Sequence, residues 1–252
     1  MTLSIGIIGA SGRMGRAIAA EAREAGFAVA GGLDREGVIE GPYNDVTELA
    51  TAADVLIDFS SPEALDYTLA AAETTGTPIL IGTTGLKAEH HQRIHEASER
   101  VAVLQTANTS LGVNVLRGLV EQAARVLGTD WDIEIGEMHH RHKLDAPSGT
   151  ALLLGASAAS GRGGELTDLS RFDRMQTGPH AREEGAIYYA SLRGGSVAGD
   201  HQVVFAGEGE RIELGHRAEN RGIFAKGAIR GAQWLAGRPA GRYTMANALG
   251  FA

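Results

Sequence analysis

One short stretch of the chain places several protonatable side chains next to a possible helix start. Residues 139–151 read HHRHKLDAPSGTA, so His139 and Lys143 precede a Ser148-Gly149-Thr150 tripeptide. Imidazole titrates near neutral pH and serves as a general acid or base, while lysine supplies positive charge. The N–H groups that open a helix attract anions. These residues favour an acid-base and anion-binding site.

Two other interpretations of this stretch remain open from the residues alone. One is a solvated charged loop without a ligand. The other is a metal site built from Glu137, His139, His140 and His142. The sequence offers no pair of histidines at helical i, i+4 spacing in an HExxH motif and no cysteine thiolate, so we expect no metal.

A second candidate site lies near the N-terminus, where GIIGASGRMG follows a short apolar run. Gly9, Gly12 and Gly15 allow a pyrophosphate to approach the backbone at the start of a helix. Their spacing is GxxGxxG rather than the stricter GxGxxG of dinucleotide-binding proteins, and a purely structural glycine turn is the alternative. The position after a strand favours a cofactor site.

Asp34 and Arg35 follow the next apolar run, where an acid that recognises ribose is expected. An aspartate accepts hydrogen bonds from ribose hydroxyls, whereas an arginine binds a 2′-phosphate. Their occurrence in tandem predicts the use of both NADH and NADPH. The alternative is a solvated turn before Gly37.

The elements needed to position these residues alternate in the first half of the chain. Apolar strand runs recur at residues 3–9, 27–33, 54–59, 78–84 and 101–107, with helical patterns between them. This alternation predicts an α/β fold with a Rossmann-type, doubly wound parallel sheet. Two loops, residues 81–85 and 106–110, then follow strands at the edge where such sheets bind ligands.

From about Leu111 the pattern changes to a second α+β domain. A helix over 112–128, a strand over 131–138 and a helix from Ser148 are expected, and Gly-rich turns separate later strand runs in a mixed or antiparallel sheet. Residues 159–170 look least structured. We expect a dinucleotide-binding domain over 1–110, on which 220–252 packs, and a substrate-binding and oligomerisation domain over 111–219.

Composition excludes several classes of function. A net charge of −8 argues against a nucleic-acid binder, and the absence of cysteine removes disulfides and thiol nucleophiles. The chain shows no signal peptide and no apolar run that would span a membrane. We therefore expect a cytoplasmic protein with a small-molecule substrate.

The stretch EMHHRHKLDAPSGTA resembles the signature E-x-H-H-x-x-K-x-D-x-P-S-G-T-A of the 4-hydroxy-tetrahydrodipicolinate reductase (dihydrodipicolinate reductase) family. The resemblance extends along the chain in the family's order. It includes GASGRMG near the N-terminus, Asp34-Arg35, GTTG at 82–85 and GVNVL at 112–116. The resemblance implies NADH- or NADPH-dependent reduction of a small cyclic dicarboxylate in diaminopimelate and lysine biosynthesis. It also implies a homotetramer formed through the sheet of the second domain.

The resemblance also implies roles for individual residues. His139 and Lys143 correspond to the catalytic residues, and Lys143 also contacts substrate together with His140, Ser148, Gly149 and Thr150. The implied cofactor contacts are Gly9, Ala10, Ser11, Gly12, Arg13, Met14, Asp34, Arg35, Gly82, Thr83, Thr84, Thr106, Ala107, Asn108 and Thr109. Many members have Asn-Phe-Ser where this chain has Asn108-Thr109-Ser110, so one aromatic contact near the nicotinamide is expected to be missing.

Two rival functions remain for the chain as a whole. Another two-domain nicotinamide dehydrogenase, acting on an amino-acid or sugar derivative, would share the glycines at 9–15 but would not explain residues 139–151. A dinucleotide-sensing regulatory module would bind the cofactor without turnover, and His139 would then be dispensable.

Overall fold

The computed structural model describes residues 2–172 and 178–251. It divides into two compact units: the chain up to Leu111 together with the chain from Gly222 onward, and the segment from Gly112 to Arg221. The first unit contains β1(Ser4–Ile8), α1(Arg13–Glu24), β2(Ala28–Asp34), β3(Gly37–Glu40), α2(Val46–Ala52), β4(Val55–Asp58), the 3-10 turn η1(Pro62–Ala64), α3(Leu65–Thr75), β5(Ile79–Ile81), α4(Ala88–Ser98), β6(Ala102–Gln105), α8(Gly222–Leu235), β12(Gly241–Tyr243) and α9(Met245–Leu249).

The first unit is built on a seven-stranded sheet in the order β12-β6-β5-β4-β1-β2-β3. All neighbouring strands run parallel except β3, which forms an antiparallel pair with β2. The helical crossovers between parallel strands place helices on both faces. The predicted Rossmann-type sheet is confirmed, whereas β3, α2, β12 and α9 were not foreseen, because each is too short for a clear periodic pattern.

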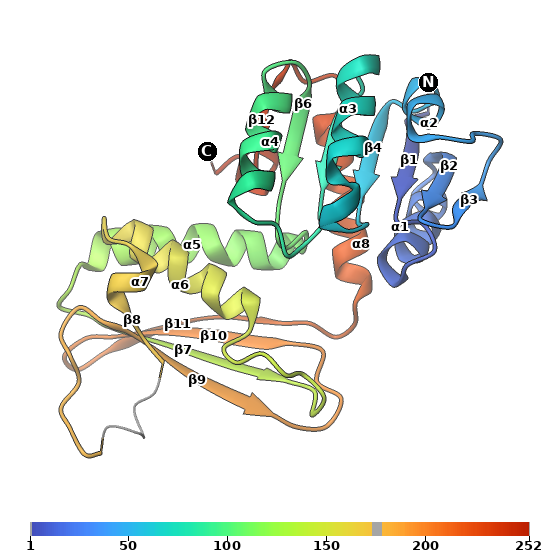
Figure 1. Ribbon diagram of the computed structural model, residues 1–252. Coiled ribbons are helices and arrows are strands. Elements are labelled where there is room, and N and C mark those ends of the chain that lie inside the picture. Colours follow the sequence, from blue (N-terminus) through green and yellow to red (C-terminus); the bar gives the residue numbers. More distant parts are fainter. Residues whose placement is uncertain (1, 173–177, 252) are drawn as a thin grey trace. The chain divides into compact units, whose positions relative to one another are not determined.

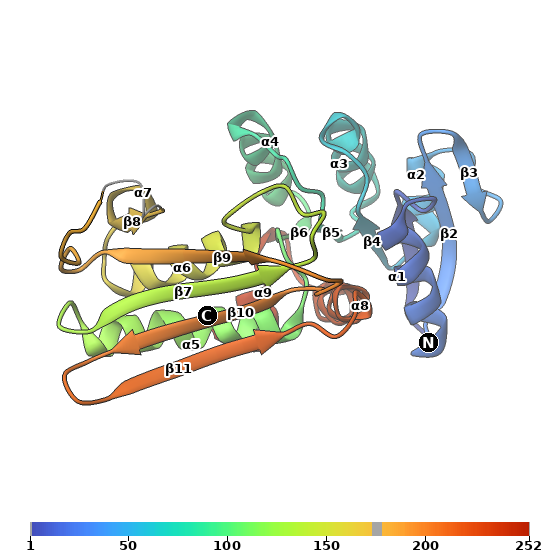
Figure 2. The same cartoon turned by 90° about the horizontal axis from the view of Figure 1, so that it is seen from below.

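Two apolar layers cover this sheet. Ile5, Ile57 and Leu104 point to the layer that contains α1, α8 and α9, while Leu56, Ile79 and Ile81 point to the layer of α2, α3 and α4. Figure 2 shows α2, α3 and α4 on one side of the sheet and α1 and α8 on the other. Strands buried on both faces explain the continuous apolar runs in the sequence.

A glycine allows α8 to approach the loop that follows β6. A Cβ atom at Gly227 would lie 1.7 Å from the carbonyl oxygen of Thr109. The Thr109 hydroxyl also donates to the carbonyl oxygen of Phe224 at 2.7 Å. These contacts anchor α8 at the loop after β6 that is predicted to bind cofactor.

The second unit is an α+β structure. Its elements are α5(Leu111–Leu127), which begins at the boundary, β7(Asp132–His139), α6(Gly149–Gly161), α7(Leu166–Leu169), β8(Ser170–Arg171), β9(Ile187–Arg193), β10(Asp200–Ala206) and β11(Arg211–Arg217). The strands form a sheet in the order β11-β10-β7-β9-β8. It is mixed, because β7 runs parallel to β9 and antiparallel to β10.

The two faces of this sheet differ. Ile133, Ile135 and Phe205 are buried against α5 and α6, which cover one face in Figure 1. The other face is here called the open face. It lines a groove of about 640 Å³ with residues that include Met138, Ala190, Leu192, Gln202 and Glu213. In the part of the chain that the structure describes, no helix of this unit covers the open face.

The segment expected to be least structured is ordered. Helix α6 continues to Gly161, and α7 and β8 occupy residues 166–171. The expectation was wrong because it relied on polar and glycine-rich composition. A Cβ at Gly161 would lie 2.3 Å from the carbonyl oxygen of Glu121, so this glycine permits close packing of α6 on α5 rather than marking a loop. No described helix is long and apolar enough to cross a membrane.

Candidate active site

The glycine-rich turn joins β1 to α1 in the first unit. Gly9 has a φ of +81°, and a Cβ there would lie 2.5 Å from the Phe59 carbonyl oxygen. A Cβ at Gly15 would lie 2.2 Å from the carbonyl oxygen of Gly9. Glycine is therefore required at both positions by the tight turn and by the approach of α1 to it. Helix α1 begins after Gly12, which has no side chain to cap the helix or to block an anion.

Asp34, the last residue of β2, is tied to this turn. Its Oδ2 accepts hydrogen bonds from the Ser11 amide at 2.9 Å and from the Ser11 hydroxyl at 2.6 Å, and its Oδ1 accepts from the Arg35 amide at 2.7 Å. The Ser11 hydroxyl is the main cause that lowers the pKa of Asp34. A carboxylate fixed in its ionised form at the end of β2 suits the recognition of ribose hydroxyls.

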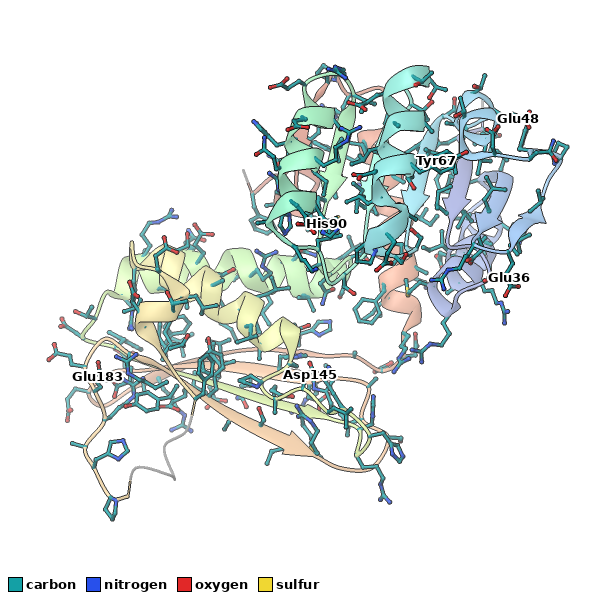
Figure 3. All side chains as sticks on the ribbon, in the orientation of Figure 1. Glu36, Glu48, Tyr67, His90, Asp145 and Glu183 are labelled. Atoms are coloured by element: carbon teal, nitrogen blue, oxygen red, sulfur yellow. The ribbon has the colours of Figure 1, made fainter. Side chains whose placement is uncertain are left out.

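A pocket of about 840 Å³ opens beside this turn. Its walls include Gly9, Ser11, Gly12, Asp34 and Arg35, all predicted from the sequence. They also include Tyr67 of α3, labelled in Figure 3, which was not predicted. Ala10 and Arg13 line neither this pocket nor the next one, because Ala10 is buried and Arg13 points to solvent.

A second pocket of about 370 Å³ shares Phe59 and Ser60 with the first. It is lined by the remaining predicted cofactor residues Met14, Gly82, Thr83, Thr84, Thr106, Ala107, Asn108 and Thr109. Although phenylalanine is missing at 109, Phe59 and Phe224 bring two aromatic side chains to this pocket. Phe224 could not be predicted for this pocket, because it lies more than a hundred residues beyond Thr109 in the chain.

The carboxyl group of Asp58 supports the second pocket from behind. Its Oδ1 accepts from the Ser60 amide at 2.8 Å and from the Thr83 hydroxyl at 3.0 Å. Desolvation is the main influence and raises the pKa of this fully buried group. Asp58 thereby holds two pocket-lining segments in place.

In the second unit, His139 is held by a buried carboxylate. His139 Nδ1 lies 2.6 Å from Glu137 Oε2. Because alternate residues of a strand share a face, β7 presents both side chains to α6. Glu137 is only 3% exposed and His139 8%. A carboxylate on Nδ1 favours the proton on that nitrogen and leaves Nε2 available for proton chemistry.

Arg193 holds Glu137 in turn. Its Nη1 donates to Glu137 Oε2 and its Nη2 contacts Oε1, each at 2.9 Å. Burial alone would raise the pKa of Glu137, but hydrogen bonds from Arg193, Ser191 and His139 together lower it. Strand β9 supplies Arg193, and its parallel register places Arg193 opposite His139. The result is an ordered chain of contacts from Arg193 through Glu137 to His139.

The start of α6 joins the same cluster. Ser148 is the N-cap: its hydroxyl accepts from the Ala151 amide at 3.2 Å, and its own amide donates to Glu137 Oε1 at 3.3 Å. Its hydroxyl also lies 3.0 Å from His201 Nε2. The Ser148 amide is therefore paired with Glu137 in this structure. A Cβ at Gly149 would meet no atom within 4 Å, so space remains beside the helix start.

The loop between β7 and α6 contains the other predicted residues. Lys143 Nζ lies 2.9 Å from Asp145 Oδ1, and Asp145 is labelled in this loop in Figure 3. Desolvation, followed by the charges of Arg221 and His142, lowers the pKa of His140. Among the residues with described side chains, no group of three or more His, Asp or Glu is arranged to hold a metal ion.

Arg193 and His201 were missed in the sequence analysis, and Glu137 appeared there only as a possible metal ligand. The alternation of β7 was enough to place Glu137 beside His139. For Arg193 and His201, the signal is strand register, which a single sequence does not reveal.

The residues present fit a nicotinamide dinucleotide. The glycine turn leaves no side chain over the start of α1, Asp34 and Arg35 lie in the wall of the adjoining pocket, and the second pocket continues from the first past Phe59. The first pocket's volume is in the range typical of small-molecule sites.

Comparisons with known proteins agree with this architecture. Residues 3–109 match the model of the dihydrodipicolinate reductase N-terminus, and residues 112–249 match that of the C-terminus. A 4-hydroxy-tetrahydrodipicolinate reductase of Zymomonas mobilis is 57% identical over 99% of this chain and 98% of its own length. The same enzyme of Parvibaculum lavamentivorans is 48% identical over 99% of both chains.

Solved structures show the same fold. A dipicolinate-bound dihydrodipicolinate reductase from Paenisporosarcina superposes with a TM-score of 0.79 at 23% identity, over 97% of this chain and 98% of its own. A C. glutamicum DAP dehydrogenase in complex with DAP superposes with a TM-score of 0.60 at 15% identity, over 97% and 93%. Since two family models together span nearly the whole chain and a relative matched over its full length is 57% identical, this chain belongs to the dihydrodipicolinate reductase family.

Proposed function

We propose that this chain reduces 4-hydroxy-tetrahydrodipicolinate to tetrahydrodipicolinate with NADH or NADPH, in diaminopimelate and lysine biosynthesis. Membership of the family makes it an NAD(P)H-dependent oxidoreductase. The observation that carries the proposal is the chain of contacts from Arg193 through the buried Glu137 and His139, beside the Ser148 helix start. It combines a group for proton transfer with a site for an anion.

The overall reaction takes up one hydride and one proton and releases the 4-hydroxyl group as water. The bound nicotinamide supplies the hydride. His139 exchanges the proton at Nε2, while Glu137 fixes the imidazole through Nδ1. Lys143 supplies positive charge for the substrate, and its ammonium group protonates the departing 4-hydroxyl group. The ring C–H proton lost in the same elimination restores the lysine, so the net uptake remains one proton.

The two substrate carboxylates are bound by the helix start and its surroundings. The amides of Gly149 and Thr150 lie in the first turn of α6, where the helix dipole favours an anion. The Ser148 hydroxyl contributes alongside them, and His140 and Lys143 approach from the preceding loop. Charge-assisted hydrogen bonds of this kind are worth about 1.5–3 kcal/mol each.

The pockets of the first unit are assigned to the cofactor. Asp34 binds the ribose hydroxyls of NADH, and Arg35 binds the 2′-phosphate of NADPH. Gly82 to Thr84 and Thr106 to Thr109 bind the nicotinamide half, where Phe59 and Phe224 provide an apolar wall.

We further propose that four copies assemble through the open face of the second unit's sheet. Leu192 is 61% exposed on this face, next to Met138 and Ala190 in the lining of the groove. Apolar side chains on an uncovered sheet favour burial against another copy.

The reaction is tested by mixing the purified chain with NADH or NADPH and freshly generated 4-hydroxy-tetrahydrodipicolinate. We expect loss of nicotinamide absorbance with both cofactors, and tetrahydrodipicolinate as the product in mass spectrometry. Diaminopimelate with NADP⁺ serves as the comparison, because a related fold belongs to a DAP dehydrogenase. Turnover of diaminopimelate without turnover of the hydroxy compound would contradict the proposal.

A further inference from the structure

His201 is a buried histidine in direct contact with the candidate site. It lies on β10, is 5% exposed, and its Nε2 is 3.0 Å from the Ser148 hydroxyl. Its ring packs edge-on against that of His139, with 5.0 Å between ring centroids. Its other nitrogen, Nδ1, is buried and has no hydrogen-bond partner among the described residues. Packing alone does not require a side chain with two nitrogens at this position.

The surroundings of His201 determine which nitrogen carries the proton. The groups that face it are His139 and Glu137 on β7, His216 on β11 and Lys143 in the loop before α6. Burial is the main cause that lowers the pKa of His201 to about 4, so the ring is neutral near pH 7 and has a single N–H. A buried N–H without a partner is rarer in proteins than a buried acceptor without one. The proton is therefore on Nε2, and the unpaired Nδ1 is an acceptor.

This tautomer leaves the Ser148 hydroxyl with one remaining function. Its oxygen accepts from the His201 Nε2–H and from the Ala151 amide, which together use both lone pairs. The Ser148 amide is already bonded to Glu137. The hydroxyl proton is then directed away from both partners, and it is available for a ligand at the start of α6.

We propose that His201 is a positioning residue that turns the Ser148 hydroxyl into a hydrogen-bond donor for a carboxylate of the substrate. The inference rests on the proposed function and extends it to a residue that touches neither substrate nor cofactor. With the opposite tautomer, the Ser148 hydroxyl would donate its proton to His201 Nε2. That proton would then not be available to bind the substrate carboxylate.

Gly199 gives the two imidazoles the room that this arrangement needs. It precedes β10, and a Cβ at this position would lie 3.0 Å from His139 Nε2 and 3.5 Å from His201 Cε1. Glycine thus keeps the reacting nitrogen of His139 uncovered while His201 packs beside it.

The tautomer is tested directly by ¹⁵N NMR of the histidine side chains in the intact protein. Protonated and unprotonated ring nitrogens have well-separated shifts, and the signals of His201 are assigned by their loss in His201→Gln. We expect a protonated Nε2 and an unprotonated Nδ1 near pH 7. A proton on Nδ1 would overturn the inference, whatever the enzyme's activity.

The function of the contact is tested by substitution. His201→Gln keeps an N–H donor near the position of Nε2, whereas His201→Leu removes it. For His201→Leu we expect about a tenfold rise in substrate KM and in the Kd of pyridine-2,6-dicarboxylate, as for the loss of a hydrogen bond to a charged group. The Kd of NADH and kcat should change less than threefold, and His201→Gln should restore substrate binding.

Ser148→Ala provides the matched control and remains informative if His201→Leu does not fold. It should raise KM and the Kd of the dicarboxylate by a similar factor. In the Ser148→Ala background, replacement of His201 by Gln or Leu should add little, because coupled residues are not additive. Additive effects, or wild-type affinity in both single variants, would overturn the role of His201. Lack of turnover by the wild-type chain would instead contradict the proposed function.

Discussion

At the scale of single residues, Glu137 determines how His139 is presented. Its two oxygens accept hydrogen bonds from His139, from two nitrogens of Arg193 and from the Ser148 amide, among others. A buried carboxylate with this many donors fixes their geometry. Its removal leaves the arginine without a counter-charge and the imidazole without its partner at Nδ1.

We therefore expect Glu137→Gln to lower kcat at least tenfold, with the Kd of NADH nearly unchanged. The amide presents a donor where His139 or Arg193 requires an acceptor. Steady-state kinetics and a cofactor titration measure the two quantities, and circular dichroism verifies folding. Glu134→Gln, on the same strand but outside the site, is the control. A folded Glu137→Gln protein with wild-type kcat would show that His139 needs no such partner.

The proposed cofactor contacts of Asp34 and Arg35 predict different losses for NADH and NADPH. Arg35→Ala should lower the affinity for NADPH at least tenfold and the affinity for NADH less than threefold, because only NADPH has the 2′-phosphate. Asp34→Ala should lower the affinity for NADH more than the affinity for NADPH. It removes the carboxylate that accepts from the ribose hydroxyls and that holds Ser11. Fluorescence titration with both cofactors gives the four affinities. Equal losses for both cofactors in both variants would refute the assignment.

At the scale of elements, strand register explains which site residues were predictable. The motif around His139 and the helix start at Ser148 were visible in the sequence, because β7 alternates and Ser148 caps α6. Arg193 and His201 lie opposite β7 only through its parallel register with β9 and its antiparallel register with β10. Register depends on packing between distant segments, which local sequence patterns do not encode.

The same register buries His201, with a consequence for acid stability. The pKa of His201 is about 4 in the folded chain, whereas the ordinary value for histidine is 6.5. Between these two pH values the unfolded chain binds a proton that the folded chain does not. The free energy of unfolding therefore falls as the pH falls through this window, by about 3 kcal/mol in total.

This dependence is measured by urea unfolding of the wild type and of His201→Gln between pH 7 and pH 4. Subtraction removes the contributions of other titrating groups. We expect the difference in unfolding free energy to shift in favour of His201→Gln as the pH decreases. A difference that stays constant with pH would show that His201 is not kept neutral by the fold.

At the scale of the whole molecule, the open face predicts the assembly. Light scattering should give a mass near four times 26.3 kDa for the wild type. Leu192→Glu should reduce this mass, because a buried interface excludes an unpaired carboxylate. Val126→Glu, at a residue 77% exposed on α5 and away from the open face, is the control. A tetramer that survives Leu192→Glu would place the interface elsewhere.

The proposed reaction and the role of His139 are tested together by comparing the wild type with His139→Gln. Both are supplied with NADH and freshly generated 4-hydroxy-tetrahydrodipicolinate, and turnover and NADH affinity are measured on the same samples. We expect the wild type to form tetrahydrodipicolinate and His139→Gln to lose about 10²- to 10⁴-fold in kcat, the range for a positioned acid-base group, with NADH affinity intact. Wild-type turnover in His139→Gln would show that His139 is not the acid-base group of the reaction.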